Sequence, residues 1–204
     1  MYGVLKTSTN TGLDSELQYI FSAPLAIKSN QPAFISDTLS LKRKTNSQNV
    51  QRWEVEAEIM PTNDSPNFLV HSISNGYTDV FYLRIPQVFT PVKLSQLLSL
   101  AMTNTKVQGS STIDLTGIGA LDLTGQFINF AGDSKVYLIT SKGTAGIGIG
   151  ISPSLISTIV SSTLLVTGDK VTMYARYDAD TQLGITYIDG ILASQGSVKF
   201  IEAL

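Results

Sequence analysis

The chain has 204 residues, of which 43% are hydrophobic and only 15% are charged, and this balance is typical of a globular protein rather than a disordered one. The formal net charge of -2 at pH 7 gives no general attraction to a polyanion, which argues against a nucleic-acid-binding protein. Because the sequence contains no cysteine, disulfides, thiolate metal sites and cysteine nucleophiles are excluded.

The N-terminal part is expected to contain strands separated by polar turns. Its first residues, MYGVLKTSTN, lack the basic and apolar stretches of a signal peptide, so none is expected. Gln18–Lys28 is apolar but contains Pro24, which predicts two short strand pieces or an edge strand with a bend. The polar cluster Lys42–Ser47 predicts a turn, so that the loosely alternating Ala33–Lys42 forms a hairpin with the strand that follows. The three basic residues of this turn are expected to be solvated rather than to form a contact patch.

The strand that follows has the clearest pattern in the sequence. In Trp53–Ile59 the apolar residues occupy odd positions and the glutamates even ones, which is the period of a strand with one buried face. Trp53 is the only tryptophan of the chain and is expected to anchor that face. The opposite face carries Glu54, Glu56 and Glu58. Because neighbours on one open face share one environment, we expect a solvated face or the wall of a protein ring, and no catalytic acid and base.

A short helix is predicted after this strand. Ser65 is a candidate N-cap, Pro66 suits the first helical position, and Gly76 is expected to end the helix. The apolar residues on one face of the helix are Phe68, Leu69 and Ile73. His71 lies in the middle of this helix as the only histidine of the chain. Without a second histidine, a cysteine or a G-x-S-x-G motif, it predicts neither a metal cluster nor a catalytic triad, and a surface or interface position is expected.

The middle of the chain predicts a connection between two units. Asp79–Pro86 is expected to form a strand that ends at its proline, and Val88–Pro91 is expected to be the crossing point. Val92–Thr105 fits either a helical turn, through its leucines, or a strand, through its serines and threonines. Both possibilities remain open for that segment.

From Ser110 onward, short stretches rich in β-branched residues and glycine predict many short strands, as in a small barrel or sandwich. Ile113–Leu123 alternates well, and Gly125–Phe130 with Lys135–Thr140 predicts a hairpin. Ile147–Val166 is the most apolar window, but serines, glycines and a proline interrupt it, so no membrane span is predicted. The last strands are expected at Val171–Tyr177, Thr186–Ile188 and Val198–Ile201.

Two further patterns have some features of known binding-site motifs. Gly146, Gly148 and Gly150 alternate with isoleucines, whereas a phosphate cradle needs a tight turn that opens a helix, so a strand with one bare face, closely approached by another backbone, is expected. The segment from Asp178 to Asp189 has the outline of a calcium loop, but the position that needs glycine is occupied by a leucine, so a hairpin turn is favoured. We therefore predict no catalytic, cofactor-binding or metal-binding residue, and no enzyme.

Two segments resemble a known family. Gln51–Ile59, followed by a turn, a helix and Phe81–Pro86, resembles the first domain of phage distal tail proteins. Gly125–Thr140, followed by Ser152–Leu155, looks like a recurring phage tail pattern in which a glycine-led strand and a short turn precede a K-V-Y strand. Together these segments make the chain similar to siphophage distal tail proteins of the coliphage T-five type.

The resemblance implies a fold and a role. The fold would be all-β with one short helix, with a tail-tube-like β-sandwich or barrel formed by residues 1–88 and 168–204 and an inserted OB-like barrel at residues 89–167. The role would be that of a structural virion protein, the baseplate hub at the distal end of the tail, assembled in the host cytoplasm. It would form a hexameric ring with copies of itself, join the tail tube protein to tip or fibre proteins, and leave a channel through which DNA passes without specific binding.

The resemblance brings no catalytic residue, cofactor or membrane contact with it. An alternative function is a host-surface oligosaccharide-binding module, in which the barrel would hold the sugar on exposed aromatic rings. The candidate rings are Phe127, Phe130 and Tyr137. Because these residues lie in predicted strands, a core position is the favoured interpretation for them.

Overall fold

The computed structural model describes most of the chain, and these parts are almost entirely β-structure. The described residues are 4–7, 19–37, 43–47, 50–60, 77–78, 80–84, 100–118, 122–179, 186–188, 191–194 and 197–204. Within these ranges there is no α-helix, and the helical structure is the single 3-10 turn η2 at Gly168–Lys170. The all-β prediction is confirmed, while the helix predicted around residues 65–76 lies outside the described residues. No helix in the described ranges has the length and apolar character needed to span a bilayer.

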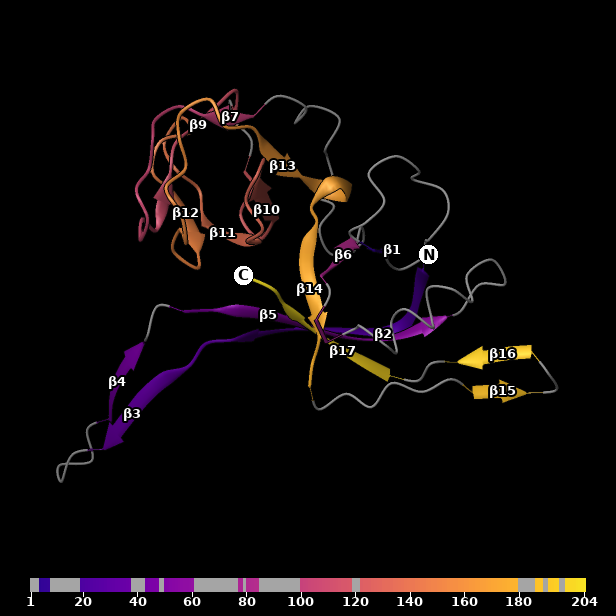
Figure 1. Ribbon diagram of the computed structural model, residues 1–204. Helices are drawn as coiled ribbons and strands as arrows, with labels where there is room; N and C mark the ends of the chain where they lie inside the picture. The colour runs from indigo at the N-terminus through magenta and orange to yellow at the C-terminus, as the bar shows by residue number, and fades with distance from the viewer. Residues whose placement is uncertain are drawn as a thin grey trace.

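Six antiparallel strands form a closed barrel, whose members can be followed in Figure 1. In order of hydrogen bonding they are β1 (Val4–Thr7), β2 (Tyr19–Asn30), β5 (Arg52–Met60), β17 (Ser197–Glu202), β14 (Met173–Tyr177) and β6 (Phe81–Arg84), which returns to β1. The prediction for the tryptophan strand is confirmed, because Trp53, Val55 and Ala57 of β5 belong to the buried apolar core of the barrel. Alternation places Glu56 and Glu58 on the outer, exposed face.

A second set of strands has an apolar core of its own. Its five-stranded sheet runs in the order β13 (Leu165–Thr167), β10 (Phe127–Phe130), β11 (Tyr137–Ser141), β12 (Ile149–Ser152) and β8 (Thr112–Ile113), beside the pair β7 (Ala101–Met102) and β9 (Leu115–Thr116). The predicted hairpin is confirmed, because Ile128 of β10 is opposite Tyr137 of β11. The single strand predicted over residues 113–123 is wrong, because Asp114 separates β8 from β9, which pair with different strands. The buried carboxylate of Asp114, which has hydrogen-bond partners of its own, lies between the end of β8 and the start of β9.

The second set of strands lies, in sequence, between two neighbouring strands of the barrel. Strands β6 and β14 are hydrogen-bonded to each other, with Met173 opposite Leu83, although residues 100–167 lie between them in the chain. We call residues 100–167 the inserted unit. In Figure 1 the inserted unit lies above β5 and near the C-terminus. The exact bounds of 89–167 and the OB-like character of this unit stay predictions, since residues 85–99 lie outside the described residues.

A two-stranded arm extends from the barrel and overturns one sequence prediction. The arm consists of β3 (Ala33–Asp37) paired with β4 (Arg43–Ser47), so the segment predicted as a polar turn at Lys42–Ser47 is a strand in its described part. The predicted hairpin between the 33–42 segment and the tryptophan strand is also wrong, because β5 pairs with β2 and β17. The described side chains of the arm, at residues 33–37 and 43–45, are exposed, and the strand character of RKTNS is seen in its backbone pairing with β3.

The remaining strands follow the predictions more closely. The segment with Pro24 forms one long strand, β2, whose register against β5 shifts between Ser22 and Ala26, where the bend was expected. The three predicted C-terminal strands are confirmed as β14, β15 (Thr186–Ile188) and β17. A strand that the sequence did not predict, β16 (Ile191–Ser194), pairs with β15 as a hairpin.

Candidate functional site: the arm and the charged face of the barrel

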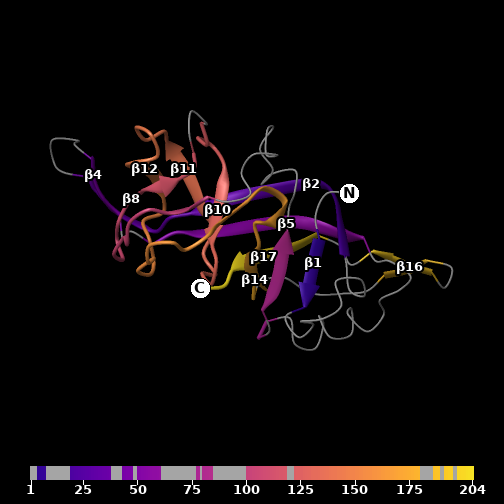
Figure 2. The same ribbon diagram turned by 90° about the horizontal axis from the view of Figure 1, so that it is seen from above.

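The arm exposes apolar side chains at a distance from either core. Phe34 is 68% exposed and its neighbour Ile35 is 59% exposed, and all five residues of β3 are exposed. Val50, where the arm returns to the barrel, is 47% exposed. Figure 1 shows the arm extending away from the barrel on the side opposite the β15–β16 hairpin, and Figure 2 shows the same arrangement from above. Adjacent exposed apolar residues on an extended element are a typical feature of a contact surface.

The strand edges of the arm are also open. Within the described residues, β3 and β4 hydrogen-bond only with each other. An isolated two-stranded hairpin is marginally stable, and its outer edges present unpaired N–H and C=O groups to any approaching strand. The arm thus combines apolar side chains with free backbone donors and acceptors, which are the two elements of recognition by strand addition.

The arm carries charge of both signs near its apolar residues. Arg43 Nε lies 3.2 Å from Asp37 Oδ1 across the strand pair, and both side chains are largely exposed. Lys44 is exposed as well. The described basic residues are exposed, but they lie on a strand and not on the predicted turn, and their solvation rather than contact with a partner stays a prediction. The sequence analysis missed Phe34 and Ile35 as a surface feature; two adjacent apolar residues, pointing to opposite faces of a strand, were the available signal.

The glutamate face of the barrel is a ladder of opposite charges. Lys28 of β2 pairs with Glu56 at 3.0 Å, and Lys199 of β17 pairs with Glu54 at 3.1 Å. Lys199 also contacts Asp178 at 2.7 Å. A hydrogen bond from the Asn30 side chain, together with Lys199, lowers the pKa of Glu54, and the two carboxylates raise the pKa of Lys199.

This arrangement changes the interpretation of the glutamate row. The expected open face is present, since Glu56 and Glu58 are exposed. However, cations from both neighbouring strands lie among the glutamates, so the surface has alternating charge and is not a uniform acidic patch. We call the outer surface of β2, β5 and β17 the charged face. The side chain of Glu54 is 13% exposed and lies between Asn30 and Lys199, whereas the side chain of Glu56 is 47% exposed and contacts Lys28.

The remaining site candidates of the sequence are placed as follows. Asp178 bonds Lys199, and residues 180–185 and 189 of the calcium-like segment lie outside the described residues. His71 lies outside them as well. Among the residues that the structure does describe, no group of three or more His, Asp or Glu side chains could hold a metal ion.

The glycine pattern forms a turn and the start of a strand. Gly146 and Gly148 adopt φ of +85° and +71° in the connection between β11 and β12, so the predicted bare-faced strand is wrong for them and holds only for Gly150 in β12. The expected close backbone approach is confirmed at Gly146, whose carbonyl accepts from Leu115 N at 2.7 Å and where a Cβ would lie 2.4 Å from Leu115 O.

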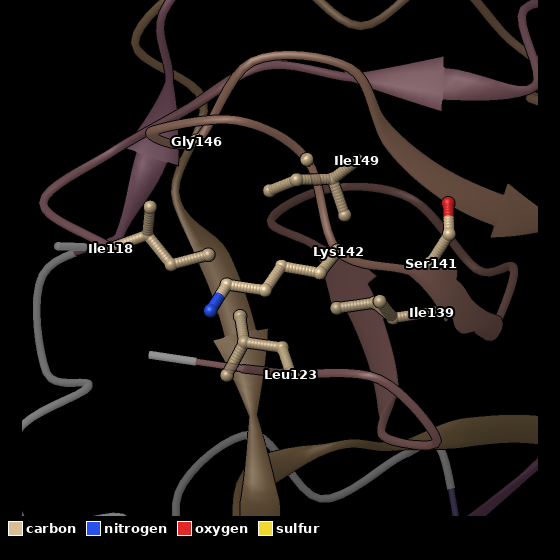
Figure 3. Close-up of a pocket in the computed structure, with 8 residues that line it drawn as sticks. Ile118, Leu123, Ile139, Ser141, Lys142, Gly146 and Ile149 are labelled. Carbon is tan, nitrogen blue, oxygen red and sulfur yellow. The ribbon is translucent and has the colours of Figure 1, made fainter. Parts of the chain in front are cut away.

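A small hollow lies beside this glycine turn (Figure 3). Its walls are mostly aliphatic, with the stem of Lys142 among them. The labelled lining residues are Ile118, Leu123, Ile139, Ser141, Lys142, Gly146 and Ile149. The cavity volume of about 10 Å³ is room for roughly one water molecule, so the hollow is a packing gap of the inserted unit and not a ligand site.

The aromatic residues suggested for sugar binding lie in the core. Phe130 and Tyr137 are 1% and 0% exposed and pack with their ring centroids 5.6 Å apart. Phe127 is half-buried and its ring meets the edge of Trp53 at 5.1 Å. The favoured core interpretation is confirmed for Phe130 and Tyr137, and the three rings form no exposed platform for a sugar.

Comparison with known proteins assigns no family to the chain. No family model matches it, and no curated protein gives a significant match. The segments that resemble distal tail proteins coincide with well-defined elements: Gln51–Ile59 lies on β5, and Gly125–Thr140 contains β10 and most of β11. Any functional conclusion therefore rests on these segments and on the surfaces described above.

Proposed function

We propose that this chain is a structural protein of a phage tail, a distal tail protein whose barrel assembles with copies of itself into a ring. The ring, expected to be a hexamer, joins the tail tube to the tail tip or central fibre and leaves a channel for DNA. The observation that carries the proposal is the arm, with its exposed Phe34 and Ile35 and its open strand edges. The sequence resemblance supplies the class of assembly.

The first argument is energetic. Exposed apolar side chains on an element with two open strand edges favour association with another chain. Burying Phe34 and Ile35 against a partner would stabilise the complex by roughly 1.5–3 kcal/mol for each side chain. The described side chains of the arm are exposed and belong to neither apolar core, so they are free to contact another molecule.

The second argument is geometric. A ring forms when one surface of a subunit contacts a different surface of the next subunit and the rotation closes. The arm and the β15–β16 hairpin project on opposite sides of the barrel (Figures 1 and 2). Two different projections on opposite sides are what such head-to-tail contacts require.

The charged face has the properties expected of a surface that lines a DNA channel or is exposed to solvent. Its glutamates and lysines nearly balance, so it has no excess of positive charge to hold phosphate groups. We propose that this face points to the channel or to solvent and not to the seam between subunits, because charged side chains are costly to desolvate. DNA is then cargo of the channel and not a bound ligand, and the proposed role includes no catalysis.

The proposal is tested by electron microscopy and native mass spectrometry of the purified protein. We expect rings for the wild-type chain and monomers for the arm variant Phe34→Asp/Ile35→Asp, with the same melting temperature. The matched control is Val107→Asp/Val160→Asp, which changes two residues of the inserted unit with exposures of 65% and 59% and should leave rings intact.

A second experiment tests the location. Antibody labelling of purified virions should mark the distal end of the tail. Absence of the protein from purified virions would refute the phage-tail proposal, whereas rings that survive the arm variant would refute only the role of the arm.

A further inference from the structure

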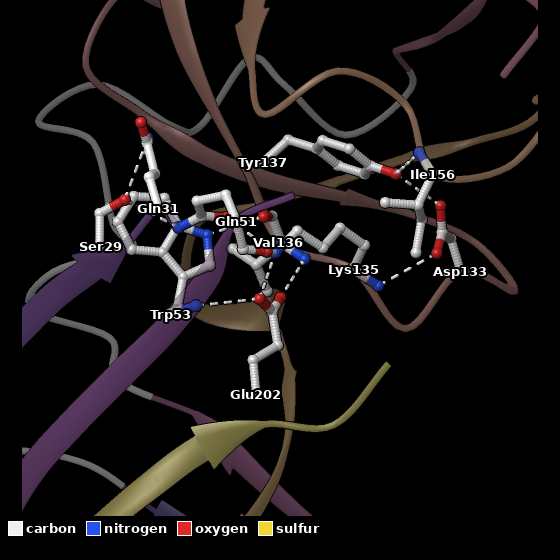
Figure 4. Close-up of polar contacts among 10 residues, drawn as sticks. All are labelled: Ser29, Gln31, Gln51, Trp53, Asp133, Lys135, Val136, Tyr137, Ile156 and Glu202. Atoms are coloured by element: carbon white, nitrogen blue, oxygen red, sulfur yellow. Dashed lines mark hydrogen bonds and ion pairs between the residues drawn. The ribbon is translucent and has the colours of Figure 1, made fainter. Parts of the chain in front are cut away.

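The barrel and the inserted unit meet in a buried polar network, which we call the junction (Figure 4). Lys135 comes from the inserted unit and Glu202 from strand β17 of the barrel, and neither side chain has any exposed surface. Gln51, at the root of the arm, is also buried. Buried ionic groups of this kind are rare, so their arrangement calls for a specific explanation.

The ammonium group of Lys135 has a full set of acceptors. It donates to Gln51 O and Gln51 Oε1, both at 2.8 Å, and to Glu202 Oε2. An ammonium group has three N–H donors, so each has a partner. The acceptors come from two strands of the barrel region, which fixes the position of the ammonium from two directions.

The carboxylate of Glu202 is satisfied in the same way. Its Oε1 accepts from Val136 N at 2.9 Å, and its Oε2 accepts from Trp53 N at 3.1 Å as well as from Lys135. In return, Trp53 Nε1 donates to Val136 O at 2.8 Å. Both backbone polar groups of Val136 are therefore held by barrel side chains, much as a strand is held by a neighbouring strand.

Apolar packing surrounds this network on one side and is incomplete on another. Val136 belongs to the buried core of the barrel, and Phe127 of the inserted unit packs against Trp53. Further along, an open cleft of about 160 Å³ lies between Gln31 and Val50 at the root of the arm and residues 151–154 of the inserted unit. Close packing therefore does not extend over the whole contact between the barrel and the inserted unit.

We propose that the junction is an orientation lock, in which the Lys135–Glu202 pair and its hydrogen bonds hold the inserted unit in one orientation on the barrel. Apolar contacts alone are non-directional and would tolerate a rotated or tilted arrangement. In the junction, by contrast, a small rotation would separate buried charges from their partners, and the cost of an unpaired buried charge is high. Replacing a buried pair by apolar groups is often tolerated in stability, so the benefit of the charges would lie in specificity.

The lock also reaches the root of the arm. Gln51 Nε2 donates to Ser29 Oγ at 3.1 Å, and Gln31 Nε2 donates to the same oxygen at 3.2 Å. Gln51 thus links Lys135 of the inserted unit to the strands from which the arm extends. The lock would consequently set the direction of the inserted unit relative to the arm as well as to the barrel.

The test measures the distance between the two units in the full chain. Because the sequence has no cysteine, spin labels can be placed at single introduced cysteines without other changes. One label replaces the exposed Arg176 on β14 and the other replaces Val160 on the inserted unit, and pulsed electron paramagnetic resonance of labelled chains diluted in an excess of unlabelled chains gives the distance distribution within one chain. A control pair at Val107 and Ile147 reports distances within the inserted unit.

We expect one narrow peak for the wild-type chain and loss of that single peak in the uncharged variant Lys135→Met/Glu202→Gln, with the control pair unchanged. Replacement of the exposed pair by Arg43→Met/Asp37→Asn should leave the peak as it is. A broad distribution in the wild-type chain, or an unchanged narrow peak in Lys135→Met/Glu202→Gln, overturns the proposal. If that variant does not fold, Trp53→Phe decides, since it removes the bond to Val136 O while it keeps an aromatic ring in the barrel core: broadening supports the lock and an unchanged peak overturns it.

Discussion

The junction buries polar side chains, whereas the arm exposes apolar ones. In the junction, Lys135 and Glu202 are fully buried, and each polar atom of the pair has a partner within the same chain. In the arm, Phe34 and Ile35 expose more than half of their surface. The polar groups of the junction are therefore satisfied within a single copy of the chain, whereas the arm leaves apolar side chains and strand edges open.

The ion pairs of the two regions illustrate the same difference. Arg43 and Asp37 pair at 3.2 Å on the arm with side-chain exposures of 66% and 56%, whereas the junction pair has none. An exposed pair is screened by water and contributes roughly 0–1 kcal/mol. A buried pair is worth little over an apolar replacement, but removing one partner costs much, since it leaves the other charge uncompensated. The predictions below test this contrast, beginning with the largest effect.

The largest effect is expected from breaking the buried pair on one side. Lys135→Met alone should lower the free energy of unfolding by roughly 3–5 kcal/mol, because Glu202 would remain buried without its cation. The measurement is urea unfolding at neutral pH. The matched change on the arm, Arg43→Met, should cost at most about 1 kcal/mol. If Lys135→Met and Arg43→Met lowered the free energy of unfolding equally, water would have access to the junction.

The next effect concerns Asp114, a second buried carboxylate with partners of its own. It contacts Lys106 Nζ at 2.8 Å and Gly148 N at 2.9 Å, and these bonds hold the pKa of Asp114 below its ordinary value of 3.8. The stability that Asp114 contributes is therefore complete above about pH 4 and is lost as the pH falls through its lowered pKa. Asp114→Asn should cost about 1–3 kcal/mol at neutral pH and flatten the loss of stability in acid.

Asp37→Asn removes the carboxylate of the exposed pair on the arm and is the control, which should change the free energy of unfolding at neutral pH by at most about 1 kcal/mol. Burial raises the pKa of Glu202, whereas Lys135 and the backbone N–H groups of Val136 and Trp53 oppose that rise. If the free energy of unfolding of Asp114→Asn fell more steeply at low pH than that of the wild-type chain, Asp114 would not contribute stability as a carboxylate.

A smaller effect is expected on the charged face. Glu54→Lys/Glu56→Lys/Glu58→Lys removes the contacts with Lys28 and Lys199. The exposed Lys28–Glu56 contact is worth roughly 0–1 kcal/mol, and the Lys199–Glu54 contact, in which Glu54 is only 13% exposed, is expected to contribute more. We expect a folded protein that still assembles into rings. If the face lines the channel, phage carrying this variant should eject DNA slowly, because the new lysines attract phosphate. Loss of tail tips in electron micrographs would place the face at the seam instead.

The smallest effect on stability is expected from removing the arm. Residues 32–50 can be replaced by Asn-Gly, which suits a two-residue turn between β2 and β5. Because the described side chains of the arm are exposed, the free energy of unfolding should change by no more than about 1 kcal/mol. Ring assembly, followed by native mass spectrometry, should be lost. Unfolding of this variant would show that the arm belongs to the core of its own chain.

Local alternation was sufficient to predict much of the fold. The buried face of Trp53, Val55 and Ala57, the hairpin of β10 and β11, and the strands β14, β15 and β17 were all predicted from patterns within a few residues. Such patterns are informative because a strand with one buried face repeats every two residues wherever it lies in the chain. The all-β class follows from the sum of these local signals.

Strands that pack on no core could not be predicted from local alternation. RKTNS has no alternation to detect, since β4 packs on nothing, and its pairing with β3 is visible only in the folded chain. The same holds for the exposure of Phe34 and Ile35, because their apolar character by itself predicts burial. The candidate surface for assembly was therefore a result of the tertiary structure.

The junction shows the limit most clearly. Lys135 and Glu202 are 67 positions apart, and nothing near either residue indicates a buried partner. The sequence by itself determined which strands have one buried face, because burial and period are local properties. Which strands become neighbours, and which lysine meets which glutamate in a dry contact, was decided by the closure of the barrel and by the packing of the inserted unit against it, because only long-range packing brings such groups together.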